Sequence, residues 1–143
     1  MENLSQKIKD KALELGFYAC GISKADLLVE DAKRLKKWLS EEKHAGMKYM
    51  EGHFEKRTDP RKLLENAKSV ISVLFNYTPK NYLPEEDNFK ISSYAYGTDY
   101  HFVLKKKLKS LLEYISSKAG ENNSRVFVDS ARSLTEHGQN GQV

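Results

Sequence analysis

The feature that most constrains the fold is a short apolar run at residues 69–75, Ser-Val-Ile-Ser-Val-Leu-Phe. Its β-branched residues favour the extended backbone of a strand over a helix. Two further apolar runs, residues 17–22 and 125–128, predict shorter strands, and residues 91–96 are expected to be extended. Strands of this kind need helices to cover them.

Helical spacing of apolar residues predicts three longer helices between these runs. The first occupies residues 4–15, the second reaches about residue 43, and the third ends near residue 119. In addition, Pro60 starts a short helix that ends at Ala67. The predicted caps are Gly16, Ser23 or Asp26, Thr98 or Asp99, and Gly120. The pattern predicts an α/β or α+β fold, with a small sheet covered by helices in a single domain.

Composition sets the broad class of the protein. The chain has 143 residues, room for one compact domain, and a formal charge of +4 from 24 basic and 20 acidic residues. Much of the excess lies in two lysine-rich helices, at residues 33–37 and 105–109. Each reads most simply as a solvated helix face, although two basic faces on the same side would form a surface for phosphates.

Cysteine content and hydropathy limit the compartment. Cys20 is the only cysteine, so the chain has no internal disulfide and cannot by itself ligate an iron–sulfur cluster. The sequence starts with no signal-peptide pattern and has no apolar run of membrane-spanning length. These features favour a cytoplasmic protein that does not associate with membranes. We also expect a monomer.

The first segment that helices and strands do not explain runs from residue 44 to residue 60, a polar stretch too long for a simple connector. Near its end, Arg57 and Arg61 flank a turn, where guanidinium groups bind phosphates or carboxylates. An Arg–Asp pair that pins the loop is the simpler interpretation. His44, His53 and His137 lack partners at metal-ligand spacing, so they are interpreted as surface residues and no metal site is predicted.

Two further segments place polar side chains beside predicted strands. Residues 91–101 combine three tyrosines, a histidine and small hydroxyl residues before a helix, which suits ligand binding and suits a capped helix equally well. Asp129 follows the last apolar run, where it is a general acid if burial raises its pKa, or a helix N-cap. Spacing alone favours the cap.

Taken in order, these segments resemble the epoxyqueuosine reductase family. The similarity extends from residue 4 to residue 131 and includes the blocks at residues 12–17, 47–50, 56–61, 67–73, 94–101 and 128–131. It implies that residues 1–131 form the family's N-terminal cobalamin-binding part. That family reduces epoxyqueuosine in tRNA to queuosine with cobalamin and two [4Fe–4S] clusters.

The resemblance also implies roles for individual residues. Arg57 would contact the cobalamin, Ser92, Ser93 and Tyr94 would lie against the corrin, and Asp129 would give a proton to the oxygen derived from the epoxide. The family usually has arginine where this chain has Ser93, which removes one contact. The chain holds no ligands for the clusters, so the resemblance implies that it is inactive alone. It also implies that the chain exposes surface that the missing part would cover, and low stability is the expected consequence.

Residues 132–143 differ in character from the rest of the chain. Where the family continues with Arg-Ala-Trp-Ala-Lys-Arg-Ala-Gly, residues 135–143 read Thr-Glu-His-Gly-Gln-Asn-Gly-Gln-Val. If the codons of residues 135–143 are read from their third base, the shifted reading frame can encode the family's string. These residues are therefore interpreted as an aberrant, frameshifted or disordered tail, with a native tail as the alternative. A stand-alone cobalamin-binding module and a small basic RNA-binding domain remain as alternative functions.

Overall fold

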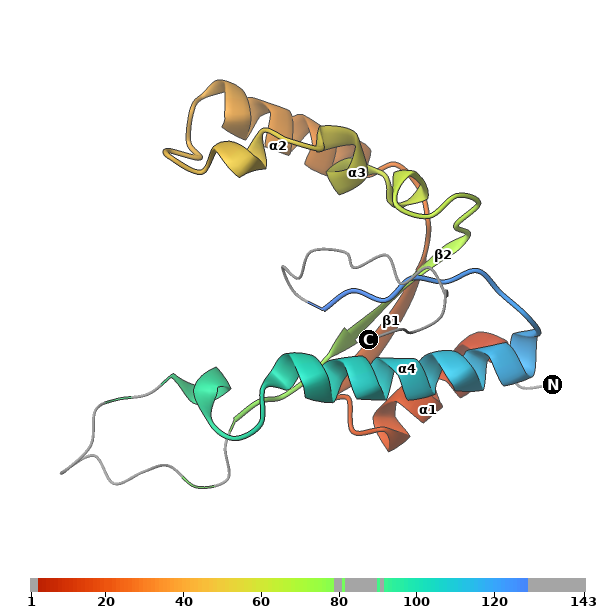
Figure 1. Ribbon diagram of the computed structural model, residues 1–143. Coiled ribbons are helices and arrows are strands. Elements are labelled where there is room, and N and C mark those ends of the chain that lie inside the picture. The colour runs from red at the N-terminus through yellow and green to blue at the C-terminus, as the bar shows by residue number, and fades with distance from the viewer. Residues whose placement is uncertain (1–2, 79–80, 82–89, 91, 129–143) are drawn as a thin grey trace, which may run out of the picture.

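A computed structural model describes residues 3–78, 81, 90 and 92–128 of the chain (Figure 1). Its α+β architecture, a two-stranded antiparallel sheet with helices, confirms the predicted fold class. The elements, with η for a 3₁₀ helix, are α1 (Leu4–Glu14), β1 (Ala19–Lys24), α2 (Val29–Ser40), η1 (Lys48–Met50), α3 (Phe54–Thr58), η2 (Pro60–Lys62), β2 (Ser69–Leu74), η3 (Ser93–Ala95) and α4 (Tyr100–Ala119).

The two strands pair so that their apolar residues share one face. Cys20 of β1 lies opposite Val73 of β2, and Ile22 lies opposite Ile71. The alternate pair, Gly21 with Ser72, belongs to the other face and is exposed. Period-two alternation of side chains therefore gives the sheet one apolar face to bury.

Helices α1 and α4 cover that apolar face (Figure 1). The buried centre consists of Ile8 and Ala12 of α1, Phe17 of the following loop, and Leu111 of α4. The half-buried residues packed around them are Leu15, Cys20, Ile22, Ile71, Val73, Phe75, Leu104, Leu108 and Ile115. This cluster joins segments from both ends of the described chain, so it defines one domain core.

Helices α2 and α3 lie on the opposite side of the sheet from α1 and α4 (Figure 1). They form a pair of their own, in which the backbone N–H of Leu28 at the start of α2 donates to the carbonyl of Thr58 at the end of α3 (2.8 Å). Neither helix contributes to the cluster beneath the sheet.

Several predicted element ends are confirmed, and two predictions are wrong. The helix predicted from Pro60 to Ala67 is only η2, which ends at Lys62. Asp99 caps α4 by accepting from the backbone N–H of His101 (2.9 Å), Gly120 is its C-cap residue, and Pro60 begins η2. Helix α2 begins only at Val29, without a side-chain cap, so neither Ser23 nor Asp26 caps it. Asp26 instead pairs with Lys24 (3.0 Å).

Two predicted extended segments also differ in the structure. Residues 125–128 form no strand. Arg125 is held instead by a side-chain bond in which its Nη1 donates to the carbonyl of Leu63 (2.9 Å). Ser93–Ala95 forms a 3₁₀ turn closed by a bond from the N–H of Ala95 to the carbonyl of Ser92 (2.9 Å). A strand needs a pairing partner, and among the described residues neither segment pairs with β1 or β2.

Three sequence predictions lie wholly or partly outside the described residues: Asp129, the interpretation of residues 132–143 as a tail, and the extended start at residue 91. Among the helices that the structure does describe, none is both long and apolar enough to cross a membrane.

Candidate functional site

Arg57 lies on α3 and holds the loop that precedes it. Its Nε donates to the carbonyl of Gly52 (3.1 Å) and its Nη2 to the carbonyl of Tyr49 (3.2 Å). The side chain is exposed nonetheless, and a guanidinium carries five N–H donors. Arg57 is therefore fixed in place by two backbone carbonyls with donors left for a ligand.

Arg61 forms the Arg–Asp pair that the sequence suggested as the simpler interpretation. Its Nε and Nη2 donate to the two carboxylate oxygens of Asp59 (2.8 and 2.9 Å). This side-chain bond, more than any other influence, lowers the pKa of Asp59 and raises that of Arg61. Asp59 also accepts from the backbone N–H of Arg61 (3.0 Å), which starts η2. The pair organises the turn and leaves Arg57 as the better ligand candidate of the two arginines.

His44 was interpreted as a surface residue, and the structure corrects this. Only 7% of it is exposed, its ring packs against Trp38 (centroids 5.7 Å apart), and its Nε2 lies 2.9 Å from Oε1 of Glu51. Trp38 comes from α2 and Glu51 from the loop after η1, so the ring fastens the loop to the helix. His53 is exposed and has a left-handed backbone (φ 59°) at the start of α3.

The segment around η3 presents an aromatic cluster. Tyr94, 57% exposed, packs edge-to-face with Tyr100 (centroids 6.3 Å, 83°). Tyr100 in turn lies against the ring of His101 (4.1 Å). Ser92 precedes the turn and Ser93 begins it. The cluster offers hydroxyl groups beside a flat apolar surface, which suits a large planar ligand.

Asp99 fixes the start of α4 beside this cluster. Its Oδ1 accepts from the backbone N–H of His101 and lies 2.9 Å from Nδ1 of the same residue. The backbone bond is the main reason why the pKa of Asp99 is lowered, so the carboxylate remains charged and orients the imidazole. The capped-helix interpretation is thus correct, and it coexists with an exposed aromatic surface.

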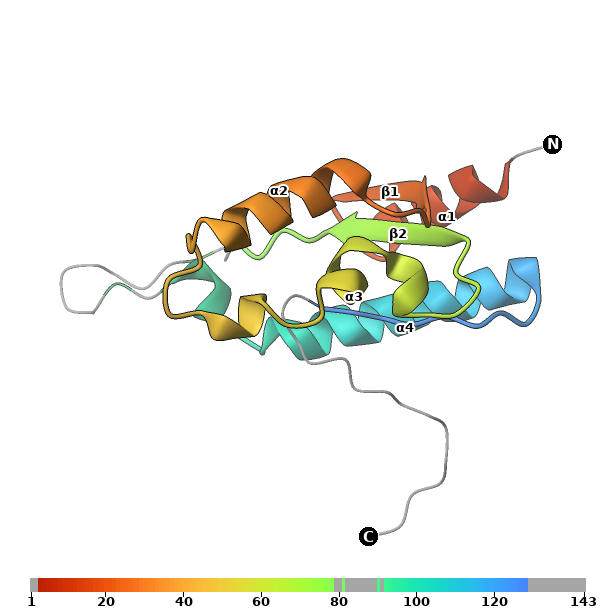
Figure 2. The same cartoon turned by 90° about the horizontal axis from the view of Figure 1, so that it is seen from above.

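The structure does not bring these two segments together. Helix α3 and η3 lie apart in both views, with α3 on the α2 side of the sheet and η3 at the start of α4 (Figures 1 and 2). Asp129, the third predicted site residue, is outside the described residues. Arg57 and Tyr94 are consequently two separate contact points rather than one pocket.

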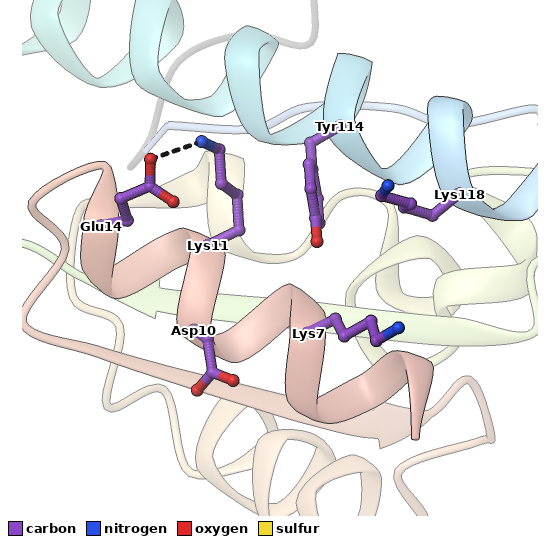
Figure 3. Close-up of a pocket in the computed structure, with 6 residues that line it drawn as sticks. All are labelled: Lys7, Asp10, Lys11, Glu14, Tyr114 and Lys118. Carbon is purple, nitrogen blue, oxygen red and sulfur yellow. Dashed lines mark hydrogen bonds and ion pairs between the residues drawn. The ribbon is translucent and has the colours of Figure 1, made fainter. Parts of the chain in front are cut away.

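A hollow lies elsewhere, between α1 and α4 (Figure 3). It is shallow, with a volume of about 370 Å³, and is lined by Lys7, Asp10, Lys11, Glu14, Tyr114 and Lys118. Lys11 is already paired with Glu14 (2.8 Å), and both Lys11 and Lys118 lie near the ring of Tyr114 (5.6 and 5.7 Å). These mutual contacts explain the hollow as a helix–helix seam.

The described residues include no cluster of metal-ligating side chains, and Cys20 is partly buried. No group of three His, Cys, Asp or Glu side chains lies close enough to hold a metal ion in that part of the chain. Cys20 is half-buried under the sheet, and burial raises the pKa of its thiol. The thiol therefore stays protonated and acts as a small core residue.

Comparison with known proteins decides the family. The family model described as "Epoxyqueuosine reductase QueG, DUF1730" matches residues 57–130, half of the chain. The chain belongs to this family.

Relatives of the epoxyqueuosine reductase family agree over most of the chain. An epoxyqueuosine reductase of Leadbetterella byssophila is 54% identical over 131 residues, which are 92% of this chain and 43% of that protein. One of Cellulophaga algicola is 54% identical over 130 residues, 91% of this chain and 42% of that protein. The solved structure of the Streptococcus thermophilus epoxyqueuosine reductase superposes with a TM-score of 0.69 at 33% identity, covering 85% of this chain and 33% of that one.

The chain therefore spans about two fifths of the length of the curated relatives that it matches. The family match begins at Arg57 and includes η3, α4 and the segment that Arg125 anchors. Sequence reasoning missed the pairing of His44 with Glu51, which lies before the matched range. Their spacing of seven residues with Trp38 nearby is the only signal that was available.

Proposed function

We propose that this chain is the cobalamin-binding part of an epoxyqueuosine reductase, a cytoplasmic, monomeric enzyme that acts on tRNA carrying epoxyqueuosine. The observation that carries the proposal is the family match over residues 57–130, because that range contains every residue proposed for the site. These are Arg57, Ser92, Ser93, Tyr94 and Asp129.

The described residues fit a large, flat, polar-edged cofactor in their chemistry. Arg57 is exposed and pre-positioned by two backbone carbonyls, so it loses little side-chain entropy when it binds a carbonyl or phosphate group. Tyr94 offers an exposed ring for contact with a macrocycle, and Ser92 is exposed beside it. The proposal requires cobalamin to contact both points, which lie on different elements.

The proposed reaction converts an epoxide into an alkene. Both carbon–oxygen bonds break, two electrons enter, and the oxygen leaves as water after taking two protons. Cobalamin, when bound, supplies the electrons to carbon. On this proposal Asp129 holds one proton for the departing oxygen, and it does so best where an apolar surrounding keeps the carboxylic acid neutral.

The [4Fe–4S] clusters of the family would need several thiolates, and the 143 residues contain one cysteine. We therefore expect the chain alone to bind cobalamin without turning over epoxyqueuosine in tRNA. Turnover by the purified chain would contradict this expectation, whereas binding without turnover also fits the alternative of a stand-alone cobalamin-binding module.

Titration of the chain with hydroxocobalamin, followed by the absorbance of the corrin, tests the proposal. Wild type is expected to bind, and Arg57→Lys is expected to bind about tenfold more weakly because lysine keeps the charge and loses the planar fork. Arg34→Lys on exposed α2 is the matched control and is expected to bind as wild type does. No spectral change in wild type, or equal affinities for both variants, would overturn the assignment of Arg57.

A further inference from the structure

The sequence contains two lysine-rich helices of similar appearance, and the structure separates them. Helix α2 carries four basic and two acidic residues, a net charge of +2, whereas α4 carries five lysines and one glutamate, a net charge of +4 with histidine neutral. The two helices lie on opposite sides of the sheet (Figure 1). They cannot form one phosphate-binding surface.

Most cations of α2 are neutralised by neighbouring carboxylates. Lys33 pairs with Glu30 (2.8 Å) and Arg34 with Asp31 (3.3 Å). Lys37 lies 3.9 Å from Glu41, beyond the end of the helix. A polyanion would have to compete with these ion pairs for the same groups.

The outer face of α4 differs in this respect. Lys105, Lys106 and Lys109 are all exposed, and within residues 3–78, 81, 90 and 92–128 no carboxylate lies within 4.0 Å of their Nζ atoms. At 100° per residue they fall, together with Phe102, into a sector of roughly 100° that points away from the buried Leu111. Phe102 is 72% exposed. We call these four residues the α4 stripe.

Packing separates Lys107 from the α4 stripe. Lys107, which lies between its members in sequence, turns inward and donates to the carbonyl of Leu15 (2.5 Å). Glu113, the one carboxylate of α4, follows Lys109 by one turn and marks the end of the stripe. Asp99 attracts Lys105 from beyond ion-pair distance, but among the described residues none of the three lysines has an ion-pair partner. Three like charges on one rigid face repel one another, and a polyanion relieves that repulsion.

We propose that the α4 stripe is an RNA-docking surface, in which the three lysines contact successive phosphates and Phe102 stacks on an unpaired base. The stripe extends for about 10 Å along the helix, at 1.5 Å per residue. Exposed aromatic rings beside cations are the features by which proteins hold unpaired RNA without reading its sequence. This inference rests on the proposed function for its choice of RNA as the polyanion.

A pair of matched triple variants tests the surface. Lys105→Gln/Lys106→Gln/Lys109→Gln removes the stripe, and Lys33→Gln/Lys36→Gln/Lys37→Gln on α2 is the control, because each lowers the net charge from +4 to +1. Binding to a fluorescent tRNA transcript is measured by anisotropy from about 50 to 200 mM salt. The stripe variant is expected to bind at least about tenfold more weakly, with the salt slope reduced by about two, and the α2 variant to change less than about threefold.

Two further measurements keep the result independent of folding. Acetylation of wild-type protein is expected to slow at Lys105, Lys106 and Lys109 when tRNA is present and to continue at Lys33. Phe102→Leu, which keeps an apolar side chain without an aromatic face, is expected to weaken binding by about tenfold.

Four results would each overturn the inference. The first two are equal tRNA affinity of both triple variants and equal acetylation rates at all lysines in the presence of tRNA. The other two are unchanged tRNA affinity of Phe102→Leu and tighter binding of wild type to phosphatidylserine vesicles than to tRNA. Hydroxocobalamin titration of the same samples separates it from the proposed function. If wild type binds cobalamin while loss of the stripe leaves tRNA binding intact, only the docking surface is wrong. If the stripe binds tRNA and wild type takes up no cobalamin, only the cofactor proposal fails.

Discussion

The two sides of the sheet are held together by different forces. On the α1–α4 side, apolar residues that are distant in sequence pack into one cluster, from Ile8 to Leu111. On the α2–α3 side, the main side-chain bonds are local and polar: Arg57 reaches back to Tyr49, and His44 reaches forward to Glu51. The first side depends on tertiary burial, and the second on polar bonds within residues 28–58.

This difference predicts unequal stability within one domain. Burial of apolar area is the dominant favourable contribution to folding, whereas exposed polar bonds each add little. We therefore expect the α1–β1–β2–α4 unit to open only with global unfolding and the α2–α3 pair to open at lower free energy. The predictions below test this contrast, from the largest effect to the smallest.

The largest effect is expected from truncation of the core. Leu111→Ala leaves a cavity between α4 and the sheet and should lower the free energy of unfolding by about 2–5 kcal/mol. Denaturant titration measures the loss, with Leu13→Ala as control because Leu13 is 51% exposed. Similar losses for both variants would show that this side is not held by burial.

Lys107 provides a long-range side-chain hydrogen bond on the same side. Lys107→Met keeps the aliphatic stem near Phe75 but removes the bond to the carbonyl of Leu15, with an expected loss of about 1–3 kcal/mol. Lys106→Met, on the exposed face, should change stability by less than about 0.5 kcal/mol. Thermal unfolding of the two variants measures these losses. If Lys107→Met were as stable as wild type, the bond to Leu15 would not stabilise the fold.

A substitution on the α2–α3 side is expected to loosen that side without affecting α1 and α4. His44→Ala removes the contact with Trp38 and the bond to Glu51, with an expected cost of about 1 kcal/mol. Hydrogen exchange should quicken in α2 and α3 and remain unchanged in α1 and α4. The control variant is His53→Asn. His53 is exposed, and asparagine tolerates its left-handed backbone. Equal acceleration in α4 would show that the two sides unfold together.

The smallest effect depends on pH. The pKa of Asp59 is lowered in the folded chain by Arg61, so the stabilisation is complete above the ordinary value of 3.8 and is lost as the pH falls through the lowered value. The melting temperature of wild type should therefore exceed that of Asp59→Asn at neutral pH and converge with it in acid. A difference that is constant with pH would mean that the charge of Asp59 is not what stabilises the turn.

Local sequence signals predicted the elements whose cause is local. Asp99 and Pro60 begin their segments as expected because caps and fixed φ angles act within a few residues. Residues 125–128 have the composition of a strand and are not one, since a strand exists only where a partner edge is available. Of the candidate site, Arg57 and Tyr94 could be named from sequence, but their separation could not.

The sequence alone thus determined the fold class, the family resemblance and the identity of the candidate ligand-binding side chains, because patterns of apolar and capping residues act at short range. Only the tertiary structure decided which lysine-rich helix carries unpaired charge, that His44 is buried, and that the two halves of the proposed site lie apart. Those properties depend on which distant segments meet, and contacts such as that between Lys107 and Leu15 join residues that no local pattern connects.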